Sequence, residues 1–210
     1  MASQEILLIG AGGHAAACID VIEQHGEFSV AGLTGAAAEV GRRILGYAVL
    51  GTDAELPVLL RRHRNALVVV GQIKTPDVRI RLFEHLMQLG AVLPVIVSPR
   101  AYVSRHATLG PGTIVMHDAV VNAGAAIGHN CILNTKSLIE HHAKIGDHCH
   151  ISTAAVVNGD VVIASGTFVG SNTEIREGVR IGERCLIGMG QRVLSDCPAG
   201  TKLPTSKEHA

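Results

Sequence analysis

The sequence predicts two folds in succession, a small α/β domain with a parallel sheet and then a parallel β-helix. Two observations carry this prediction. Residues 1–100 alternate short apolar runs with amphipathic stretches. Residues 103–198 repeat with a period of six, which fits neither a helix nor an alternating strand. The period changes near residues 98–102, so we expect domains at 1–100 and 101–198 and a polar tail at 199–210.

In the second region every sixth residue is Val, Ile or Leu. Sixteen consecutive hexads share this feature, and they begin at Val103, Leu109, Val115, Val121, Ile127, Leu133, Ile139, Ile145, Ile151, Val157, Ile163, Val169, Ile175, Ile181, Ile187 and Val193. The fifth residue is Ala, Ser, Thr or Cys in thirteen of the sixteen hexads, and it faces the same side of a short strand as the next first residue. One large and one small inward side chain per strand fill a narrow prism, and three hexads per coil give about eighteen residues per turn. The spacing leaves the handedness of the coil open, although parallel crossovers in general favour a right-handed path.

In the first region, apolar runs bounded by Gly and Pro predict the strands, and helical periodicity predicts the helices. We expect strands at 5–9, 28–33, 46–50, 66–70 and 91–97, and helices at 14–24, 53–62 and 76–88. The last helix has Pro76 at its start and Gly90 beyond its end, an order typical of helix boundaries. Strands that alternate with helices in this way predict a small Rossmann-like parallel sheet.

The turn after the first strand reads Gly10-Ala11-Gly12-Gly13-His14-Ala15, which fits the G-x-G-x-x-A pattern of dinucleotide-binding turns. Such a turn offers backbone N–H groups at a helix N-terminus to a phosphate. NAD binding also requires an acidic residue at the end of the second strand, where the sequence has Leu33-Thr34-Gly35. We therefore favour a phosphorylated or carboxylate-bearing sugar at this turn, and a tight turn without a ligand remains an alternative.

Composition excludes several function classes. The formal charge is zero, with 18 basic and 18 acidic residues, and 2% of residues are aromatic, which disfavours nucleic-acid binding. No apolar run approaches the length of a membrane span. Four of the five cysteines fill the small inward hexad position, which indicates structural residues in a reducing, cytoplasmic setting rather than a disulfide framework.

Seven of the twelve histidines lie in the hexads: His106, His117, His129, His141, His142, His148 and His150. Metal binding is one interpretation, because imidazole is a common metal ligand. However, His117, His129 and His141 are spaced by twelve residues, which places them on different faces of a three-sided prism. We therefore predict no metal site, and we expect His106, His117, His129 and His148 to be polar residues on solvated turns or at a trimer seam.

The hexads, together with Gly10–His14 and the run Asn134-Thr135-Lys136-Ser137-Leu138-Ile139-Glu140-His141, resemble the hexapeptide-repeat acyltransferases. That family forms left-handed β-helices and usually assembles as trimers. Within it, the chain is similar to the bacterial surface-sugar acetyltransferases, namely sialic acid O-acetyltransferases and N-acetyltransferases of nucleotide-linked amino sugars. The resemblance covers nearly the whole chain, and it implies acetyl-CoA and a small sugar as the substrates of a homotrimer.

Acetyl transfer from a thioester needs a base near neutral pH and a hydrogen-bond donor for the oxyanion. His141 is the third residue of its hexad, on an outward turn, and the residue eighteen positions later is Gly159. We therefore expect a backbone N–H of the next coil, near Gly159, to pass directly above His141, where it could supply the oxyanion donor. The resemblance makes His141 the catalytic base, places Asn134 in the same site and makes His150 a contact of the acetyl-CoA thioester. Glu140 is a candidate for orienting His141, as are Asp147 and a residue of an adjacent subunit.

The resemblance also implies binding residues. Those expected near coenzyme A, besides His150, are Gly159, Gly170, Ser171, Gly188 and Gly190. Those expected near the sugar are Gly12, Gly13, His14, Gly71 and Gln72. Each coenzyme glycine has an alternative interpretation as a residue that serves only the corner of a coil.

The chain departs from the family pattern at three places. His142 follows His141 where several N-acetylating relatives have a carboxylate. Gly32–Ala36 lacks the aspartates that usually contact a nucleotide, and Pro198–Pro204 replaces the usual final Gly-x-Pro-Ala turn. The missing aspartates favour O-acetylation of a sialic-acid-like sugar. N-acetylation of a nucleotide-linked 4-amino sugar is the alternative, and a non-catalytic trimeric scaffold is a further one.

Overall fold

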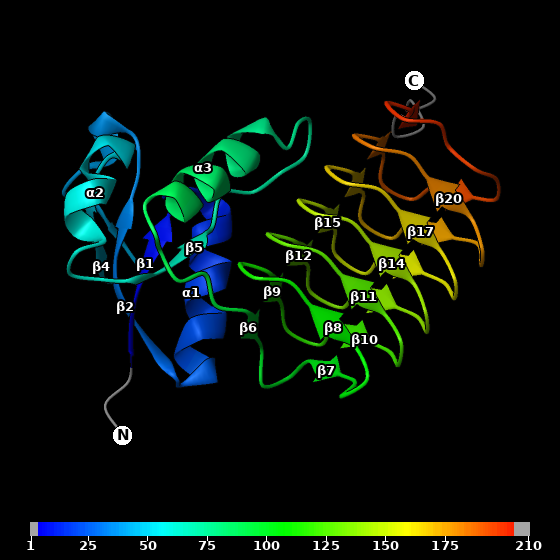
Figure 1. Cartoon of the computed structure of the whole chain (residues 1–210), viewed down its shortest axis with the longest axis horizontal. Coiled ribbons are helices and arrows are strands. Elements are labelled where there is room, and N and C mark those ends of the chain that lie inside the picture. Colours follow the sequence, from blue (N-terminus) through cyan, green and yellow to red (C-terminus); the bar gives the residue numbers. More distant parts are fainter. Residues whose placement is uncertain (1–3, 204–210) are drawn as a thin grey trace. The chain divides into compact units, whose positions relative to one another are not determined.

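The computed structural model describes residues 4–203. They form two compact units, which we describe separately (Figure 1). Unit 1 contains the residues up to Gly71 together with Asp77–Pro99, and unit 2 contains Gln72–Pro76 and the residues from Arg100 onward. The segment Gln72–Pro76 therefore packs with the repeats, although it lies inside the first hundred residues.

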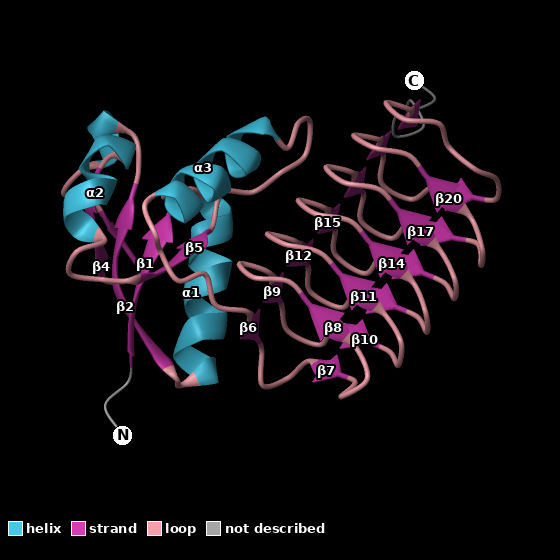
Figure 2. Ribbon diagram, viewed as in Figure 1, coloured by secondary structure: helices cyan, strands magenta, loops and turns pink. Residues whose placement is uncertain are grey.

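Unit 1 is built on one mainly parallel sheet with the strand order β3-β4-β2-β1-β5 (Figure 2). The strands are β1 (Gln4–Ile9), β2 (Phe28–Thr34), β3 (Arg43–Ile44), β4 (Tyr47–Gly51) and β5 (Asn65–Val68), and the short strand β6 (Ile96–Val97) lies outside this sheet. The helices are α1 (Gly13–His25), α2 (Leu56–Leu59) and α3 (Asp77–Gln88), with the 3₁₀ turns η1 (Ala37–Glu39) and η2 (Asp53–Glu55). The β3–β4 pair is antiparallel, and the other pairs are parallel.

The sequence accounts for most of these elements. Ile6–Ile9 are fully buried because β1 is central in the sheet. Helix α1 ends at Gly26, which adopts the left-handed conformation (φ +78°) that glycine tolerates best. Two expected elements differ. The expected helix 53–62 is a 3₁₀ turn followed by one turn of α2, and the expected strand 91–97 reduces to a bridge at Val92 and the short β6. Pro94 lies between these two pieces and has no N–H for a sheet ladder.

Unit 2 is a three-sided prism of two-residue strands. The first sheet contains β7 (Tyr102–Val103), β10 (Val120–Val121), β13 (Leu138–Ile139), β16 (Val156–Val157), β19 (Glu174–Ile175) and β22 (Arg192–Val193). The second contains β8 (Thr108–Leu109), β11 (Ala126–Ile127), β14 (Lys144–Ile145), β17 (Val162–Ile163) and β20 (Arg180–Ile181). The third contains β9 (Ile114–Val115), β12 (Ile132–Leu133), β15 (His150–Ile151), β18 (Phe168–Val169), β21 (Leu186–Ile187) and β23 (Lys202–Leu203).

Each strand pairs in parallel with the strand one coil away, as Val120 does with Leu138. The first hexad positions form the core; Val121, Ile139, Val157 and Ile175, for example, have no exposed surface. The small fifth positions are also inward, and Cys131 and Cys149 stack in successive coils as buried free thiols. These features confirm the predicted fold class, an α/β domain followed by a left-handed β-helix of hexads.

The end of the prism differs from expectation. Cys197 bridges to Ile181, and β23 pairs with β21, so coil pairing continues past Pro198 to Leu203. The first residues of the predicted tail, 199–203, are thus part of the stacked coils. The remainder of that tail, residues 204–210, lies outside the described residues.

Candidate active site

His141 lies on the edge of the prism between the first and second sheets, in the turn from β13 to β14. We call this edge the His141 edge; it carries Asn122–Gly124, Glu140–His142 and Asn158–Asp160 in successive coils. The turn closes with a hydrogen bond from the Ala143 N–H to the Glu140 carbonyl (3.3 Å). Since both flanking strands are paired, the backbone under His141 is fixed.

The His141 ring has two close neighbours. Its Nδ1 lies 3.2 Å from Nδ1 of His142, and the two rings meet edge to face, with an interplanar angle of 76°. On the coil above, a Cβ added to Gly159 would lie 2.5 Å from Cε1 and 2.8 Å from Nε2 of His141. The ring therefore rests against Gly159, and only glycine leaves room for it there. Both histidines are exposed in the described chain.

The two predicted carboxylate partners do not reach the His141 ring. Oε2 of Glu140 accepts hydrogen bonds from the His141 backbone N–H (3.2 Å) and from Nδ2 of Asn122 (3.0 Å). Glu140 thus holds the backbone of the turn. Oδ1 of Asp147 accepts from the His129 N–H (2.7 Å). The group that faces Nδ1 of His141 is instead Nδ1 of His142.

A backbone donor directly above His141 was expected for the oxyanion. The N–H that meets this residue belongs to Asp160, and it donates to the His141 carbonyl oxygen (3.1 Å). That donor is therefore committed to the stacking of the coils. Gly159 itself passes over the ring as expected, with its carbonyl accepting from the Gly178 N–H.

Asn134 and His150 form a second cluster, which also includes Gln72. His150 is 6% exposed, its Nδ1 donates to the Gln72 carbonyl oxygen (2.7 Å), and its Nε2 accepts from Nδ2 of Asn134 (3.2 Å). The side-chain Oδ1 of Asn134 accepts from the Thr135 N–H (2.8 Å). The ring of Phe168 packs against His150 edge to face, with the ring centroids 5.2 Å apart. Both ring nitrogens of His150 are thus engaged within the chain.

The structure does not bring Asn134 to His141 within one chain. Asn134 lies on the edge between the third and first sheets, which we call the Asn134 edge, and β13 separates it from the His141 edge. Gly170, Ser171, Gly188 and Gly190 follow the same edge as Asn134, two and three coils above it. The residues expected in one site therefore occupy both sides of the first sheet, with His141, Glu140 and Gly159 on one side.

Two of the residues expected near coenzyme A have a structural role within a single chain. A Cβ on Gly170 would lie 2.5 Å from the Gly188 carbonyl carbon, so the absence of a side chain at Gly170 permits the close stacking of these coils. Ser171 Oγ lies 3.0 Å from Ser152 Oγ in the coil below. Gly190 has open space where a side chain would stand, although its φ of +68° favours glycine.

Unit 1 has its own pocket, at the carboxyl ends of its parallel strands, where ligands bind in folds of this class. The cavity measures about 530 Å³. Its lining residues are Gly10, Ala11, Gly12, Gly35, Ala36, Glu39, Thr52, Asp53, Ala54, Val70, Val78 and Leu82. Gly12 lies just before α1 and offers no side chain to cap it, so the first turn of this helix presents N–H groups toward an anion.

Sequence reasoning missed two acidic residues of this pocket, Glu39 and Asp53. Glu39 comes five residues after the end of β2, but η1 turns it back. Its Oε2 accepts from the Ala36 N–H (2.8 Å) and lies 2.8 Å from the position of a Cβ on Gly35. A carboxylate thus stands beside the end of β2 after all. The pattern of an acidic residue three positions after a turn residue, as in Ala36–Glu39, was the available signal.

The other predicted sugar contacts lie elsewhere. Gly13 and His14 belong to the first turn of α1, and Nε2 of His14 accepts from the thiol of Cys18 (3.4 Å). Burial raises the pKa of this thiol to about 12, so Cys18 remains protonated. The backbone of Gly71 passes beside His14, where an added Cβ would lie 3.6 Å from the His14 Cβ. Gln72 belongs to the His150 cluster, and its buried side chain donates to the Gly166 carbonyl oxygen (3.4 Å).

Two further searches concern residues 4–203 only. No group of three or more His, Cys, Asp or Glu side chains in this range is arranged to hold a metal ion. Among the helices described, none has the length and apolar character to cross a membrane.

Comparisons with known proteins agree with this architecture. Residues 5–86 match the PglD N-terminal domain family. A variant of perosamine N-acetyltransferase from Caulobacter crescentus, solved with CoA and GDP-perosamine, is 29% identical, with a TM-score of 0.91 over 98% of this chain and 96% of that one. The acetyltransferase domain of PglB from Neisseria gonorrhoeae FA1090, solved with acetyl coenzyme A, is 27% identical, with a TM-score of 0.88 over 97% of both chains.

WeeI from Acinetobacter baumannii AYE, at 20% identity and a TM-score of 0.84, shares the fold over 98% of both chains. No match was found among curated protein sequences. The domain match at the N-terminus, the hexad prism and the likeness to two acetyltransferase structures over nearly the whole chain agree with one another. The chain therefore has the architecture of the hexapeptide-repeat acyltransferases and is similar over nearly its whole length to these two acetyltransferases.

Proposed function

We propose that this protein is an acetyl-CoA-dependent N-acetyltransferase that acts on a nucleotide-linked amino sugar used for bacterial surface polysaccharides. The observation that carries this substrate class is the unit 1 pocket, in which the N-terminus of α1 and two carboxylates line one cavity. The helix end suits a diphosphate. Glu39 and Asp53 suit the N–H and hydroxyl donors of a nucleoside.

The same pocket argues against O-acetylation of a sialic-acid-like sugar, the substrate class that the missing aspartates favoured. The carboxylate of free sialic acid could occupy the helix end, but free sialic acid has no nucleoside base to donate N–H groups to Glu39 and Asp53. The relatives support the proposed class, since the Caulobacter enzyme was solved with a nucleotide amino sugar and CoA. O-acetylation of a sialic-acid-like sugar stays as the second candidate for the experiment below.

We assign His141 as the general base of direct transfer. The amine nitrogen of the sugar would attack the thioester carbonyl carbon, the C–S bond would break, and Nε2 of His141 would take the proton that the amine loses. Nε2 suits this role because Nδ1 faces His142 and the ring is held against Gly159. Glu140 would position the turn through the His141 backbone N–H.

We further propose a homotrimer whose sites form between subunits. The outward side chains of the first four strands of the first sheet are apolar, namely the half-buried Val120, Leu138 and Val156 and the 59% exposed Tyr102, whereas the last two strands present Glu174 and Arg192. This sheet separates the His141 edge from the Asn134 edge, so a second copy packed beside it would bring its Asn134 edge to His141. In this arrangement His150 would orient Asn134, and the glycines above Asn134 would line the path of coenzyme A.

The test is thiol release from acetyl-CoA with a panel of acceptors. The panel contains GDP- and UDP-linked 4-amino sugars, free sialic acid and CMP-sialic acid, each with wild type and His141→Ala. We expect release with an amino sugar nucleotide and its loss in the variant. Release with sialic acid alone would select the second candidate. Absence of coenzyme binding in calorimetry would favour the scaffold alternative.

A further inference from the structure

His142 is the recorded partner of the His141 imidazole, and its own position is fixed. Its backbone has a φ of +59°, and its N–H donates to the Ala123 carbonyl oxygen in the coil below (3.2 Å). Its ring lies over Gly124, where an added Cβ would be 2.7 Å from Cδ2 and 3.1 Å from Nε2. The ring is thus held between the coil below and His141.

The two Nδ1 atoms face each other at 3.2 Å, which is hydrogen-bond distance and requires one hydrogen between them. For Nε2 of His141 to accept a proton, Nδ1 of His141 must carry the hydrogen and donate it to His142. His142 then carries its own hydrogen on Nε2. The contact permits either histidine to be the donor, and this is the arrangement in which His141 can act as a base.

We propose that His142 is the positioning residue of this acyltransferase and forms with His141 a hydrogen-bonded histidine pair that keeps Nε2 of His141 free to accept a proton. The proposal rests on the proposed role of His141. When Nε2 of His141 takes a proton, the Nδ1–H···Nδ1 bond becomes charge-assisted and therefore stronger.

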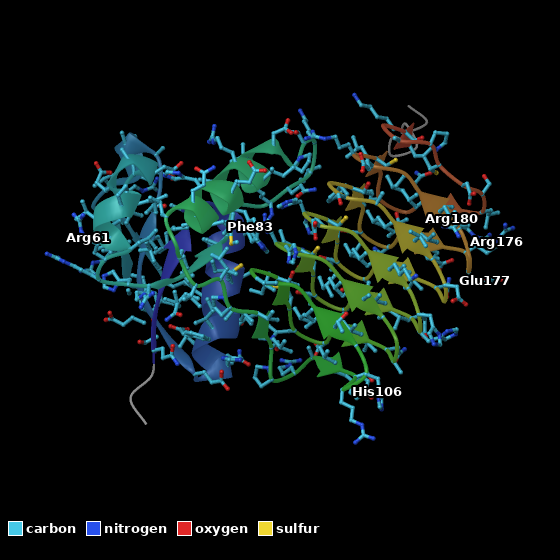
Figure 3. The ribbon with its side chains drawn as sticks, in the orientation of Figure 1. Arg61, Phe83, His106, Arg176, Glu177 and Arg180 are labelled. Atoms are coloured by element: carbon cyan, nitrogen blue, oxygen red, sulfur yellow. The ribbon has the colours of Figure 1, made fainter. Side chains whose placement is uncertain are left out.

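Other charged groups along the edge lie on the neighbouring coils. Asp160 occupies the position of His142 in the coil above, and Glu177 occupies that of His141 two coils above. Arg105 and His106 take these two positions two coils below. Figure 3 labels His106 and Glu177 on the lower and upper coils of this edge. Glu140, beside His141, is bound to the backbone and to Asn122.

The sequence offers compatible substitutions and a matched control. Asp118 and Asn130 occupy the same fourth hexad position as His142, with φ of +58° and +52°, so Asn and Asp suit this backbone. His148 is a histidine at the fourth position of the next hexad, with φ of +58°, and its Nδ1 lies 3.0 Å from Nδ2 of Asn130. The test therefore compares His142→Asn, His142→Asp and the control His148→Asn.

For His142→Asn we expect kcat to fall about 10- to 100-fold with little change in KM, because general base catalysis contributes roughly 10²–10⁴-fold and only part of it depends on orientation. For His142→Asp we expect partial recovery of kcat. We also expect the acid limb of its pH–rate profile to move to higher pH, because the carboxylate stabilises the protonated form of His141. His148→Asn should keep the wild-type kcat and pH profile.

A kcat for His142→Asn within twofold of wild type overturns the proposal. An unshifted acid limb in an active His142→Asp overturns it as well, since a merely structural role leaves the limb in place. A second readout needs no substrate: long-range ¹H–¹⁵N spectra of the free protein report histidine tautomers. Hydrogen on Nδ1 of His141 in wild type, and loss of that preference in His142→Asn, supports the pair even if no acceptor is found. Hydrogen on Nε2 of His141 refutes it.

Discussion

Units 1 and 2 assemble their candidate sites by different means. The pocket of unit 1 gathers residues from separate segments, such as Gly12 before α1, Glu39 in η1 and Asp53 in η2. The His141 edge of unit 2 gathers residues that repeat every eighteen positions, as Gly124, His142 and Asp160 do. A substitution in unit 1 thus acts within one loop, whereas a substitution in unit 2 acts on the coil above or below it.

The largest expected effect tests whether the His141 edge has a catalytic role in addition to a structural one. His141→Asn should lower kcat about 10²–10⁴-fold, the usual contribution of a general base. Asn retains part of the side chain without the basic nitrogen, so the thermal midpoint should remain within a few degrees of wild type. Steady-state kinetics and thermal unfolding measure the two quantities. Activity within tenfold of wild type would remove His141 from the role of base.

Gly159→Ala tests whether a coil acts on its neighbour. Its methyl carbon would lie 2.5 Å from Cε1 of His141, so the ring must move. We expect kcat to fall about 10-fold or more, since orientation is a large part of base catalysis. The backbone of Gly159 is outside the left-handed region, so its stability should change less than its activity.

The control for this prediction is Gly178→Ala, one coil higher on the same edge. Gly178 has open space around a Cβ but a φ of +73°. This variant should lose stability and keep its kcat. Equal kinetics for the two variants would contradict direct contact between Gly159 and the His141 ring.

In unit 1, Glu39→Gln should weaken the binding of the nucleotide sugar and leave the binding of acetyl-CoA unchanged. We expect KM for the nucleotide sugar to rise about 10-fold, the loss of one charge-assisted hydrogen bond, while KM for acetyl-CoA stays constant. Glu55→Gln is the matched control, because Glu55 accepts from the Thr52 N–H (2.6 Å) as Glu39 does from Ala36, but it does not line the pocket. Similar kinetics for both variants would assign Glu39 a capping role only.

The smallest effect concerns buried thiols, which both units contain. Burial raises the pKa of Cys18 to about 12 from an ordinary value of 9.0, so between these values the unfolded chain loses a proton that the native state keeps. Stability should therefore be complete below pH 9 and fall above it, by about 1.4 kcal/mol per pH unit for each such thiol. Urea unfolding at pH 8 and pH 10 measures this slope, which Cys18→Ala should reduce.

How much of each unit can be predicted from the sequence depends on the same difference between separate segments in unit 1 and repeated positions in unit 2. Hexads fix which residues are inward and which stack, so the prism, the buried cysteines and the position of Gly159 over His141 were predictable. The direction of a side chain was not, and for this reason Glu140 was expected beside the His141 ring that His142 occupies. In unit 1, the position of Glu39 depends on η1, a three-residue turn whose path local sequence specifies weakly. The assignment of Gln72–Pro76 to unit 2 depends on contacts with His150 and Gly166, distant in sequence.

The fixed pairing of positions eighteen apart also limits how this chain can change length. A duplication or deletion of one whole coil leaves every remaining residue on its own sheet and changes only the position of the later coils along the prism axis. A change of one hexad rotates all later residues by one face, which would move a histidine from the His141 edge to a different side. The gain or loss of whole coils can therefore change the length of the prism, whereas the edge on which a functional residue lies stays the same.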